Sequence, residues 1–215
     1  LTLLPEPPPG KTGWPWTEES DPVPAQRTDG TGWPGISIIT PSYKQGQFIE
    51  ETIRSVLLQN YPNLEYIIID GGSNDNTVEV IKKYEKWIQF WVSEKDNGQS
   101  DAINKGFNRS TGDLVNWICS DDLMCKNALN MFADEYFLGN NFCYIGKCLL
   151  IDNMGRELGS TTSKISNIDE LLDLSNYWRN GDSIAQQSAL YPLSTVKRIG
   201  GLRVNNHYTM DYELW

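Results

Sequence analysis

Short apolar runs alternate with amphipathic stretches between residues 36 and 122. The runs are rich in β-branched residues and are bounded by Gly, Pro, Asn or Asp, which is typical of strands buried on both faces. Between the runs, apolar residues recur at helical spacing, as at Ile49, Ile53 and Val56. The pattern predicts strands at 36–40, 65–70, 90–93 and 113–119, and helices near 47–59, 76–87 and 99–108. Strands separated by helices imply right-handed crossovers, so we expect an α/β fold with a mostly parallel, doubly wound sheet.

The second half of the chain is less regular. We expect a helix near 126–138, then a strand over 143–151 that turns at 152–155, and a further helix near 168–178. The chain ends at Asp211–Trp215, which has the character of the first turn of a helix, so we expect the natural protein to continue.

Residues 1–35 differ from the rest of the chain. They hold most of the eleven prolines and show no apolar periodicity, so this segment is expected to be a linker or a strap. Its three tryptophans, Trp14, Trp16 and Trp33, leave docking into a groove and tethered disorder as open alternatives. The predicted division of the chain is 1–35, 36–125 and 126–215.

The composition is acidic. Eighteen Lys and Arg against 28 Asp and Glu give a formal charge of −10, which argues against a sequence-independent nucleic-acid binder and against broad adhesion to anionic lipid. No apolar run reaches the roughly 18–20 residues needed to cross a bilayer. The four cysteines form no CxxC pair and are expected to be free thiols. We therefore expect a cytoplasmic protein with at most a peripheral association at the inner face of the membrane.

Polar and acidic residues follow each predicted strand. In an open α/β sheet, ligands bind beyond the carboxyl ends of the strands. These ends are Thr40–Tyr43, Asp70–Ser73, Glu94–Asp96 and Ser120–Asp122. Neither GxGxxG nor GxxxxGK[ST] follows the first strand, which disfavours a dinucleotide-binding Rossmann unit and a P-loop.

Carboxylates at these ends would repel a phosphorylated ligand, and a divalent cation would resolve the conflict. Mg²⁺ or Mn²⁺ takes one or two protein carboxylates and fills its remaining positions with water and phosphate oxygens. Asp121 and Asp122 can supply such ligands, and Asp70 could accept hydrogen bonds from a base or ribose. The alternative is that these aspartates only form turns and helix caps.

Several sequence blocks, taken in order, resemble one family. They are SIITPSY (37–43), FIEETIRSV (48–56), QNYP (59–62), EYIIIDGGSNDNT (65–77), GQSDAINKG (98–106) and GDLVNWICSDD (112–122). Together they resemble the family 2 glycosyltransferases of GT-A fold, which use nucleotide-diphosphate sugars. Residues 186–187, 200–201 and 211–215 also resemble the acceptor half of that family, so the resemblance covers about residues 36–215. It implies a mostly parallel Rossmann-like sheet flanked by helices, with a smaller mixed acceptor-side region.

The resemblance implies a nucleotide-binding set. Thr40, Pro41 and Tyr43 match residues that line the nucleotide pocket, with Tyr43 beside the base. Asp70 matches the acid that reads the base edge, and Asp101 would face the donor's sugar or ribose.

The remaining roles concern the metal and the reaction. By the same resemblance, Asp121 belongs with the nucleotide-binding set, Asp122 is the metal ligand and Asp211 is the catalytic base. The family's acidic motif often begins two residues before Asp121, where this chain has Cys119, and a thiol is a poor ligand for a hard ion. His207, the only histidine, is either a further metal ligand or a surface or acceptor-site residue.

The resemblance implies an inverting, metal-dependent transferase that moves a sugar from a nucleotide-diphosphate donor to a hydroxyl acceptor on a glycan or lipid-linked molecule. A UDP-sugar is the default donor, and Mg²⁺ or Mn²⁺ the cofactor. Two alternatives remain: a non-catalytic nucleotide- or glycan-binding domain of a larger assembly, and a sugar-phosphate nucleotidyltransferase. The latter class usually has a glycine-rich loop after its first strand, where this chain has Pro41-Ser-Tyr-Lys-Gln.

Other polar and aromatic residues have simpler interpretations. Lys44 and Arg54 are candidates for holding phosphate, but Arg54 is expected to be a solvated position on its helix. Trp87, Trp91 and Trp117 lie on apolar segments and are expected in the core. Trp178 and Trp215 are expected either to pack in the core or to stack on a sugar.

Overall fold

The computed structural model describes residues 3–137, 143–152, 154–163, 168–173, 184–206 and 208–215. The helices are α1 (Ile49–Leu57), α2 (Thr77–Lys83), α3 (Gln99–Arg109), α4 (Ala128–Tyr136), α5 (Ile168–Leu172), α7 (Leu193–Ile199) and α8 (Met210–Leu214). The strands are β1 (Ile36–Ser42), β2 (Leu64–Asp70), β3 (Phe90–Ser93), β4 (Leu114–Trp117), β5 (Tyr144–Ile145), β6 (Cys148–Ile151), β7 (Glu157–Thr161) and β8 (Ala189–Pro192). Two 3-10 turns, η1 (Glu85–Trp87) and η2 (Gln186–Ser188), follow α2 and precede β8.

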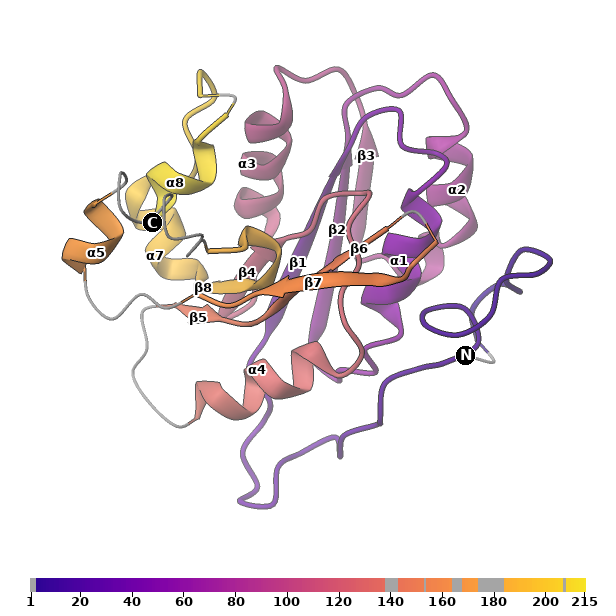
Figure 1. The fold of residues 1–215 in the computed structure, drawn as a ribbon, viewed down its shortest axis with the longest axis horizontal. Helices are drawn as coiled ribbons and strands as arrows, with labels where there is room; N and C mark the ends of the chain where they lie inside the picture. The colour runs from indigo at the N-terminus through magenta and orange to yellow at the C-terminus, as the bar shows by residue number, and fades with distance from the viewer. Residues whose placement is uncertain (1–2, 138–142, 153, 164–167, 174–183, 207) are drawn as a thin grey trace.

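The central sheet confirms the predicted α/β architecture. Its strand order is β3-β2-β1-β4-β8-β5, and β1, β2, β3 and β4 are parallel. β8 runs antiparallel to both β4 and β5, which makes the sheet mixed at one end. From β1 the chain builds outward to β2 and β3, and β4 then lies on the other side of β1 (Figure 1). The strand order therefore reverses between β1 and β4, where a ligand crevice is expected beyond their carboxyl ends.

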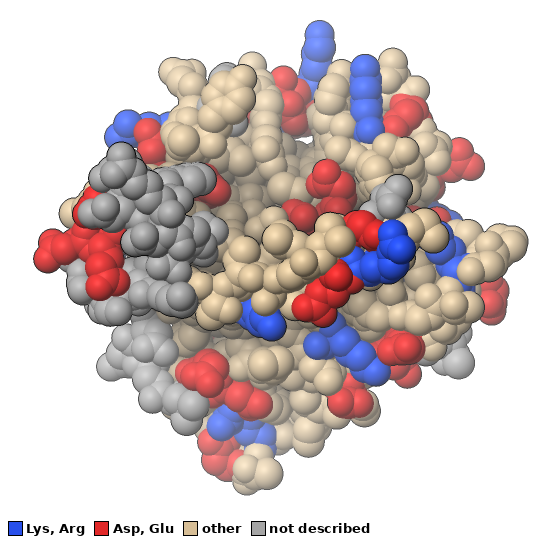
Figure 2. Space-filling model, viewed as in Figure 1, with Lys and Arg blue, Asp and Glu red and all other residues tan. Residues whose placement is uncertain are grey.

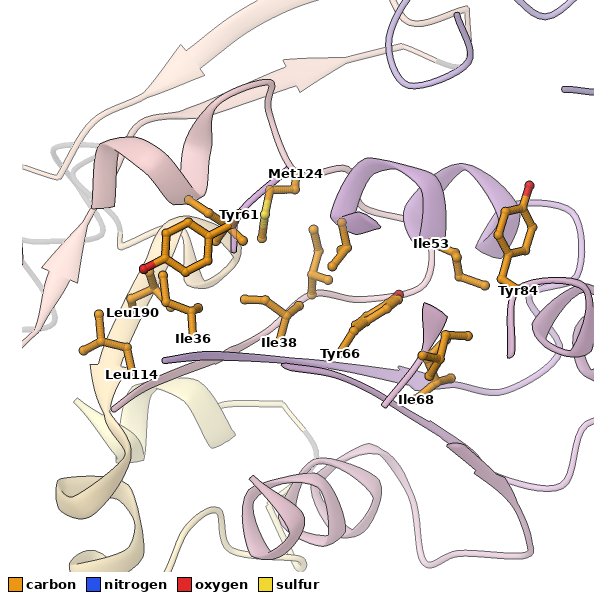
Figure 3. Packing of buried hydrophobic residues seen from close by; sticks show 14 of the residues in the cluster. Ile36, Ile38, Ile53, Tyr61, Tyr66, Ile68, Tyr84, Leu114, Met124 and Leu190 are labelled. Carbon is orange, nitrogen blue, oxygen red and sulfur yellow. The ribbon is translucent and has the colours of Figure 1, made fainter. Parts of the chain in front are cut away.

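The core has one layer on each face of the sheet. Along β1, Ile36 and Ile38 pack into a cluster with residues of α1, α2 and α4, whereas Ile39 packs into a second cluster with residues of α3 and α7. This alternation follows from the period of two along a strand. Figure 3 shows the first cluster, in which Tyr66 and Ile68 of β2 lie beneath α1.

Two predicted elements differ from the structure. The strand expected at 143–151 is divided between β5, at the edge of the central sheet, and β6, which pairs with β7 in a separate two-stranded sheet. Gly146 and Lys147 lie between the two strands, and the amide of Gly146 donates to the carbonyl of Ser188 (2.6 Å), one step beyond the last β5–β8 pair. The helix expected near 168–178 is α5 over its first five residues, and residues 174–183 lie outside the described part of the chain.

The N-terminal segment lies along the side of the molecule formed by α1 and α4 (Figure 1). Trp16 is buried, and the amide of Ser20 donates to the carbonyl of Leu58 (2.8 Å). The prediction that Arg54 is solvated was wrong: its side chain is buried, and its guanidinium donates to carbonyl groups of this segment. Among the described residues, no helix has the length and apolar character needed to cross a membrane.

Candidate functional site

The end of β4 carries a cluster of potential ligand atoms. The thiol of Cys119 and the carboxylates of Asp121 and Asp122 each offer one atom, and these atoms lie within 4.8 Å of one another. Asp121 is exposed, whereas Cys119 and Asp122 are half-buried. Figure 2, which has the same view as Figure 1, shows acidic side chains near the centre of the visible face, above the β6–β7 hairpin. The cluster therefore lies at an accessible point of the sheet edge, where the strand order reverses.

Burial and like charge dominate the electrostatics of this cluster. Burial, followed by the charge of Asp121, raises the pKa of Asp122 to about 6, and a hydrogen bond from the Gln187 side chain opposes this rise. Burial and the two carboxylates also raise the pKa of Cys119 to about 12, so its thiol is neutral at pH 7. The side chain of Gln99 donates to this sulfur through Nε2 (3.1 Å). The cluster thus has two carboxylates whose mutual repulsion a bound cation would relieve.

Helix α1 fixes the main chain of the loop that carries these aspartates. Three polar side chains on one side of α1 and just beyond its end bond to the loop. Thr52 Oγ1 donates to the carbonyl of Asp122 (2.8 Å), Ser55 Oγ accepts from the amide of Met124 (3.1 Å), and Gln59 Nε2 donates to the carbonyl of Cys125 (2.9 Å). The spacing of these residues along the helix, 52, 55 and 59, places them on one face.

A cleft of ≈ 270 Å³ lies beside the cluster. Asp122 and Gln187 line it from the sheet side, and Asp211 lines it from the first turn of α8. Gln99 and Trp117 complete part of the wall. The structure therefore brings together the predicted metal ligand and the predicted catalytic base, which are far apart in the sequence.

Apart from Asp121, which belongs to the cluster at the end of β4, the predicted nucleotide-binding residues lie elsewhere along the carboxyl edge of the sheet and are not among the residues that line this cleft. Thr40 is buried, and its hydroxyl pairs with that of Tyr66 (3.0 Å). Pro41 is buried at the end of β1, and Tyr43 beyond it is 56% exposed. Asp101, on the first turn of α3, accepts hydrogen bonds from the backbone and side-chain nitrogens of Asn97 (3.0 and 3.2 Å).

Asp70 is held inside the protein at the end of β2. Its carboxylate is fully buried and accepts hydrogen bonds from the amides of Gly72 (3.1 Å) and Ser73 (2.9 Å) and from the hydroxyls of Ser73 and Ser93. These bonds shape the loop that follows β2. Asp70 thus has a structural role in this loop. Its role in recognising the edge of a nucleotide base stays a prediction.

The comparisons with known proteins decide the family. The model of "Glycosyl transferase family 2" matches residues 37–195. The chain belongs to this family. An uncharacterized glycosyltransferase of Rickettsia typhi, RT0329, is 30% identical over 85% of this chain and 58% of its own length. The poly(ribitol-phosphate) beta-N-acetylglucosaminyltransferase TarP of Staphylococcus aureus is 30% identical over 75% of this chain and 47% of its own length. The chain thus spans no more than about three-fifths of these relatives.

Solved structures confirm the expected GT-A fold of this family 2 domain. S. aureus TarS 1–349 in complex with UDP matches with a TM-score of 0.67 at 19% identity, over 84% of this chain and 53% of that one. The mannosyltransferase PcManGT from Pyrobaculum calidifontis, in complex with GDP-Man and Mn²⁺, matches with a TM-score of 0.61 at 18% identity, over 92% of this chain and 54% of that one. At these identities the likeness establishes the fold.

The donor atoms of this family 2 site suit a hard divalent cation in part. The carboxylates of Asp121 and Asp122 are the oxygen ligands that Mg²⁺ and Mn²⁺ prefer. Cys119 does not fit, because a thiol is a soft ligand and burial keeps this one protonated. His207 and Trp178, for which alternatives were predicted, lie outside the described residues.

Sequence reasoning did not assign roles to three residues at the sheet edge of this family 2 domain. Gln187 contacts Asp122, and Gln99 contacts Cys119. Ser42, the last residue of β1, has a buried hydroxyl with no hydrogen-bond partner among the residues the structure describes. The available signal for Ser42 was its place among the residues 40–43 at the end of the first predicted strand. Gln187 had none beyond its place in the Gln186-Gln187 pair.

Proposed function

We propose that this domain transfers a sugar from a nucleotide-diphosphate donor to a hydroxyl acceptor, with inversion at the anomeric carbon. One observation carries the proposal: Asp122 and Asp211 line the same cleft at the carboxyl edge of the sheet. A transferase of this kind needs a site for the leaving diphosphate and a base for the acceptor within reach of one sugar. The family match favours sugar transfer over nucleotidyl transfer.

The donor is proposed to be a UDP-sugar. Two solved neighbours of the same fold are complexes of TarS with UDP and with UDP-GlcNAc, and a third is a complex with GDP-Man. On this chain, Thr40, Pro41, Tyr43, Asp70 and Asp101 are the proposed nucleotide-binding residues. The unpartnered hydroxyl of Ser42 is a further group that a base or ribose could satisfy.

Asp122, with Asp121 beside it, is the proposed holder of Mg²⁺ or Mn²⁺. When bound there, such a cation would supply positive charge against the departing nucleotide diphosphate. Gln187 orients the Asp122 carboxylate through its hydrogen bond. The main chain of the loop is held by α1 at Asp122 and Met124, which limits the positions open to the carboxylates.

Asp211 is the proposed general base. The acceptor oxygen forms a bond to the anomeric carbon on the face opposite the leaving group, while its proton passes to the Asp211 carboxylate. The bond from that carbon to the nucleotide diphosphate breaks, and its electron pair leaves with the diphosphate. General-base assistance of this kind contributes about 10²–10⁴-fold to the rate. A hydroxyl of a glycan or of a lipid-linked molecule is the proposed acceptor.

The test compares two site variants with a matched control in the full-length protein. Asp211→Asn should lower transfer by about 10²–10⁴-fold and leave UDP affinity unchanged. Asp122→Asn should weaken UDP binding in the presence of Mn²⁺. Asp134→Asn, which removes the same charge from an exposed position on α4, should change neither quantity. Transfer is measured as UDP or GDP release from UDP-N-acetylglucosamine, UDP-glucose and GDP-mannose with a glycan panel, and binding by calorimetry.

Three results would contradict the proposal. Normal turnover in Asp211→Asn would remove its role as base. UDP affinity that is unchanged by a chelator and by Asp122→Asn would remove the metal site. UDP binding without transfer or donor hydrolysis in the wild-type protein would favour the non-catalytic alternative.

A further inference from the structure

The N-terminal segment reaches the loop that carries the two aspartates. Residues 5–21, here called the strap, lie outside the region matched by the family model, which begins at residue 37. Residues 120–127, here called the acidic loop, contain Asp121 and Asp122. We propose that the strap is a positioning element for the acidic loop and thereby sets the affinity of the site for its cation. The effect on cation affinity rests on the proposed function, whereas the effect on the position of the acidic loop does not.

The strap is anchored on a buried charge of α1. Arg54 is 1% exposed, and its guanidinium donates to strap carbonyls at Pro5 (2.8 Å), Pro15 (3.1 Å) and Trp16 (2.9 Å). A fourth bond goes to the hydroxyl oxygen of Tyr84 (3.2 Å). A buried guanidinium needs such acceptors, because leaving it unpaired away from water is costly. The strap is therefore part of the folded domain rather than an adventitious contact.

Beyond this anchor, the strap forms hydrogen bonds with Met124 and Asn127, which begin and end the second half of the acidic loop. The indole of Trp14 donates through Nε1 to the carbonyl of Met124 (2.9 Å). At the other end, Ser20 Oγ accepts from the amide of Asn127 (2.9 Å), and the amide of Asp21 donates to Oδ1 of Asn127 (2.8 Å). The four residues from Met124 to Asn127 are thus fixed from outside the loop.

Asn127 is the point where the loop turns into α4. Its φ of 64° lies in the left-handed region, which Asn tolerates better than most residues. Its hydrogen bonds with Ser20 and Asp21 hold both its backbone and its side chain in this conformation. The strap therefore supports a turn that determines where the acidic loop ends.

The strap and α1 act on the loop from two directions. Thr52 and Ser55 hold the main chain at Asp122 and Met124 from α1, and Trp14 holds the carbonyl of Met124 from the strap. Met124 is thus bonded through its amide to the helix and through its carbonyl to the strap, two residues after Asp122. Loss of the strap contact would leave the Met124 carbonyl without this partner and widen the range of positions open to the carboxylates. Groups that orient metal ligands change metal affinity in this way.

The test compares two tryptophans whose indole groups donate to different carbonyls, one in the acidic loop and one in the N-terminal segment. Trp14→Phe removes the hydrogen bond to the acidic loop, and Ser20→Ala removes the contact at its other end. Trp33→Phe is the matched control, because the Trp33 indole also donates to a backbone carbonyl, that of Pro24 (2.7 Å), and does so within the N-terminal segment. Both tryptophans are half-buried.

Two readouts separate positioning from general stability. Amide hydrogen exchange over residues 118–129 should be faster in Trp14→Phe and Ser20→Ala than in the wild type, and unchanged in Trp33→Phe. The Mn²⁺ concentration that half-saturates the UDP-loaded protein should rise about three- to tenfold in the first two variants only, the factor equivalent to one hydrogen bond. In turnover, this should raise the Mn²⁺ requirement and leave the rate at saturating Mn²⁺ near that of the wild type.

The outcomes distinguish this proposal from the proposed function. Unchanged exchange in Trp14→Phe and Ser20→Ala overturns the strap's role. Faster exchange with unchanged Mn²⁺ affinity overturns it as well, since the strap would then stabilise the loop without positioning its ligands. If the wild-type protein binds no Mn²⁺ with UDP, the cation part of the proposed function fails, and with it the strap's effect on affinity. Exchange then decides only whether the strap holds the loop.

Discussion

Replacing Arg54 tests whether the N-terminal segment is part of the folded domain. Arg54→Met keeps much of the aliphatic volume of the side chain and removes its guanidinium. The substitution leaves three strap carbonyls, at Pro5, Pro15 and Trp16, without their donor. It also removes the donor to the hydroxyl of Tyr84, which itself donates to Glu50 Oε1 (2.7 Å). The perturbation therefore removes one guanidinium group and four hydrogen bonds.

The expected loss of stability follows from these contacts. A hydrogen bond from a charged donor contributes about 1.5–3 kcal/mol, so three carbonyls would give several times that if none could be rehydrated. The strap is at the surface, however, and it can detach so that its carbonyls bond to water. The loss is then limited to the free energy of docking the strap, and we expect about 3 kcal/mol. For a chain of this size, that corresponds to a fall in melting temperature of about 10 °C.

Urea unfolding and limited proteolysis measure the two parts of this expectation. Urea unfolding should show a lower free energy of unfolding for Arg54→Met than for the wild type. Proteolytic cleavage within residues 5–21 should become faster than global unfolding allows. Arg156→Met is the control, because Arg156 is 77% exposed and pairs with Asp152 four residues away. Exposed ion pairs contribute little, so its unfolding midpoint should not change measurably. If Arg54→Met matches this control in both assays, the strap is not anchored as the contacts indicate.

Two further predictions concern the core. Gly106→Ala should lower the free energy of unfolding, because the added Cβ would lie 2.5 Å from Cγ2 of Ile39 where α3 packs on β1. Overpacking of this kind costs about 1–3 kcal/mol. The gain in helix propensity, about 1 kcal/mol, is smaller. Urea unfolding checks this, and Gly159→Ala, where nothing lies within 4 Å, should not lose stability; equal results for the two variants would contradict the packing argument. Above pH 10, stability should fall as pH rises, because the unfolded chain then releases tyrosine protons that the folded protein retains. Urea midpoints between pH 8 and 11 and tyrosinate absorbance measure this, and a flat profile would contradict it. Burial raises the pKa of the tyrosines concerned, Tyr61, Tyr66, Tyr84 and Tyr191.

The parallel part of the sheet was predictable because each strand is defined locally. Ile36–Ser42 and Leu64–Asp70 each contain a short run of buried apolar residues, and burial on both faces follows from helices that flank the strands in sequence. Pro41 was taken as a boundary, yet β1 continues through it to Ser42. The antiparallel pairing of β8 with β4 was not predictable, since it depends on contacts between distant segments.

The role of Arg54 illustrates what a local pattern misses. On the helix it occupies a position that sequence alone would leave in solvent. Its acceptors are main-chain carbonyls of a proline-rich segment about 40 residues earlier, and carbonyls carry no sequence signal. The candidate site shows the same limit. Asp122 and Asp211 were named from resemblance, but their presence in one cleft depends on where α8 packs.

The acidic loop holds two carboxylates close together, and its contacts keep them there without neutralising their charge. Asp121 and Asp122 repel each other, and burial adds to the cost of ionising Asp122. A Lys or Arg beside them would relieve this repulsion in the absence of a ligand, but it would also compete with an incoming cation. The partner that the structure gives Asp122 is instead Gln187, a neutral donor, and the loop is held through its main chain by α1 and the strap. Neutral groups thus hold the loop and leave the charge of the carboxylates for a ligand, so under the proposed function the affinity for a cation would depend on distant residues that do not touch it.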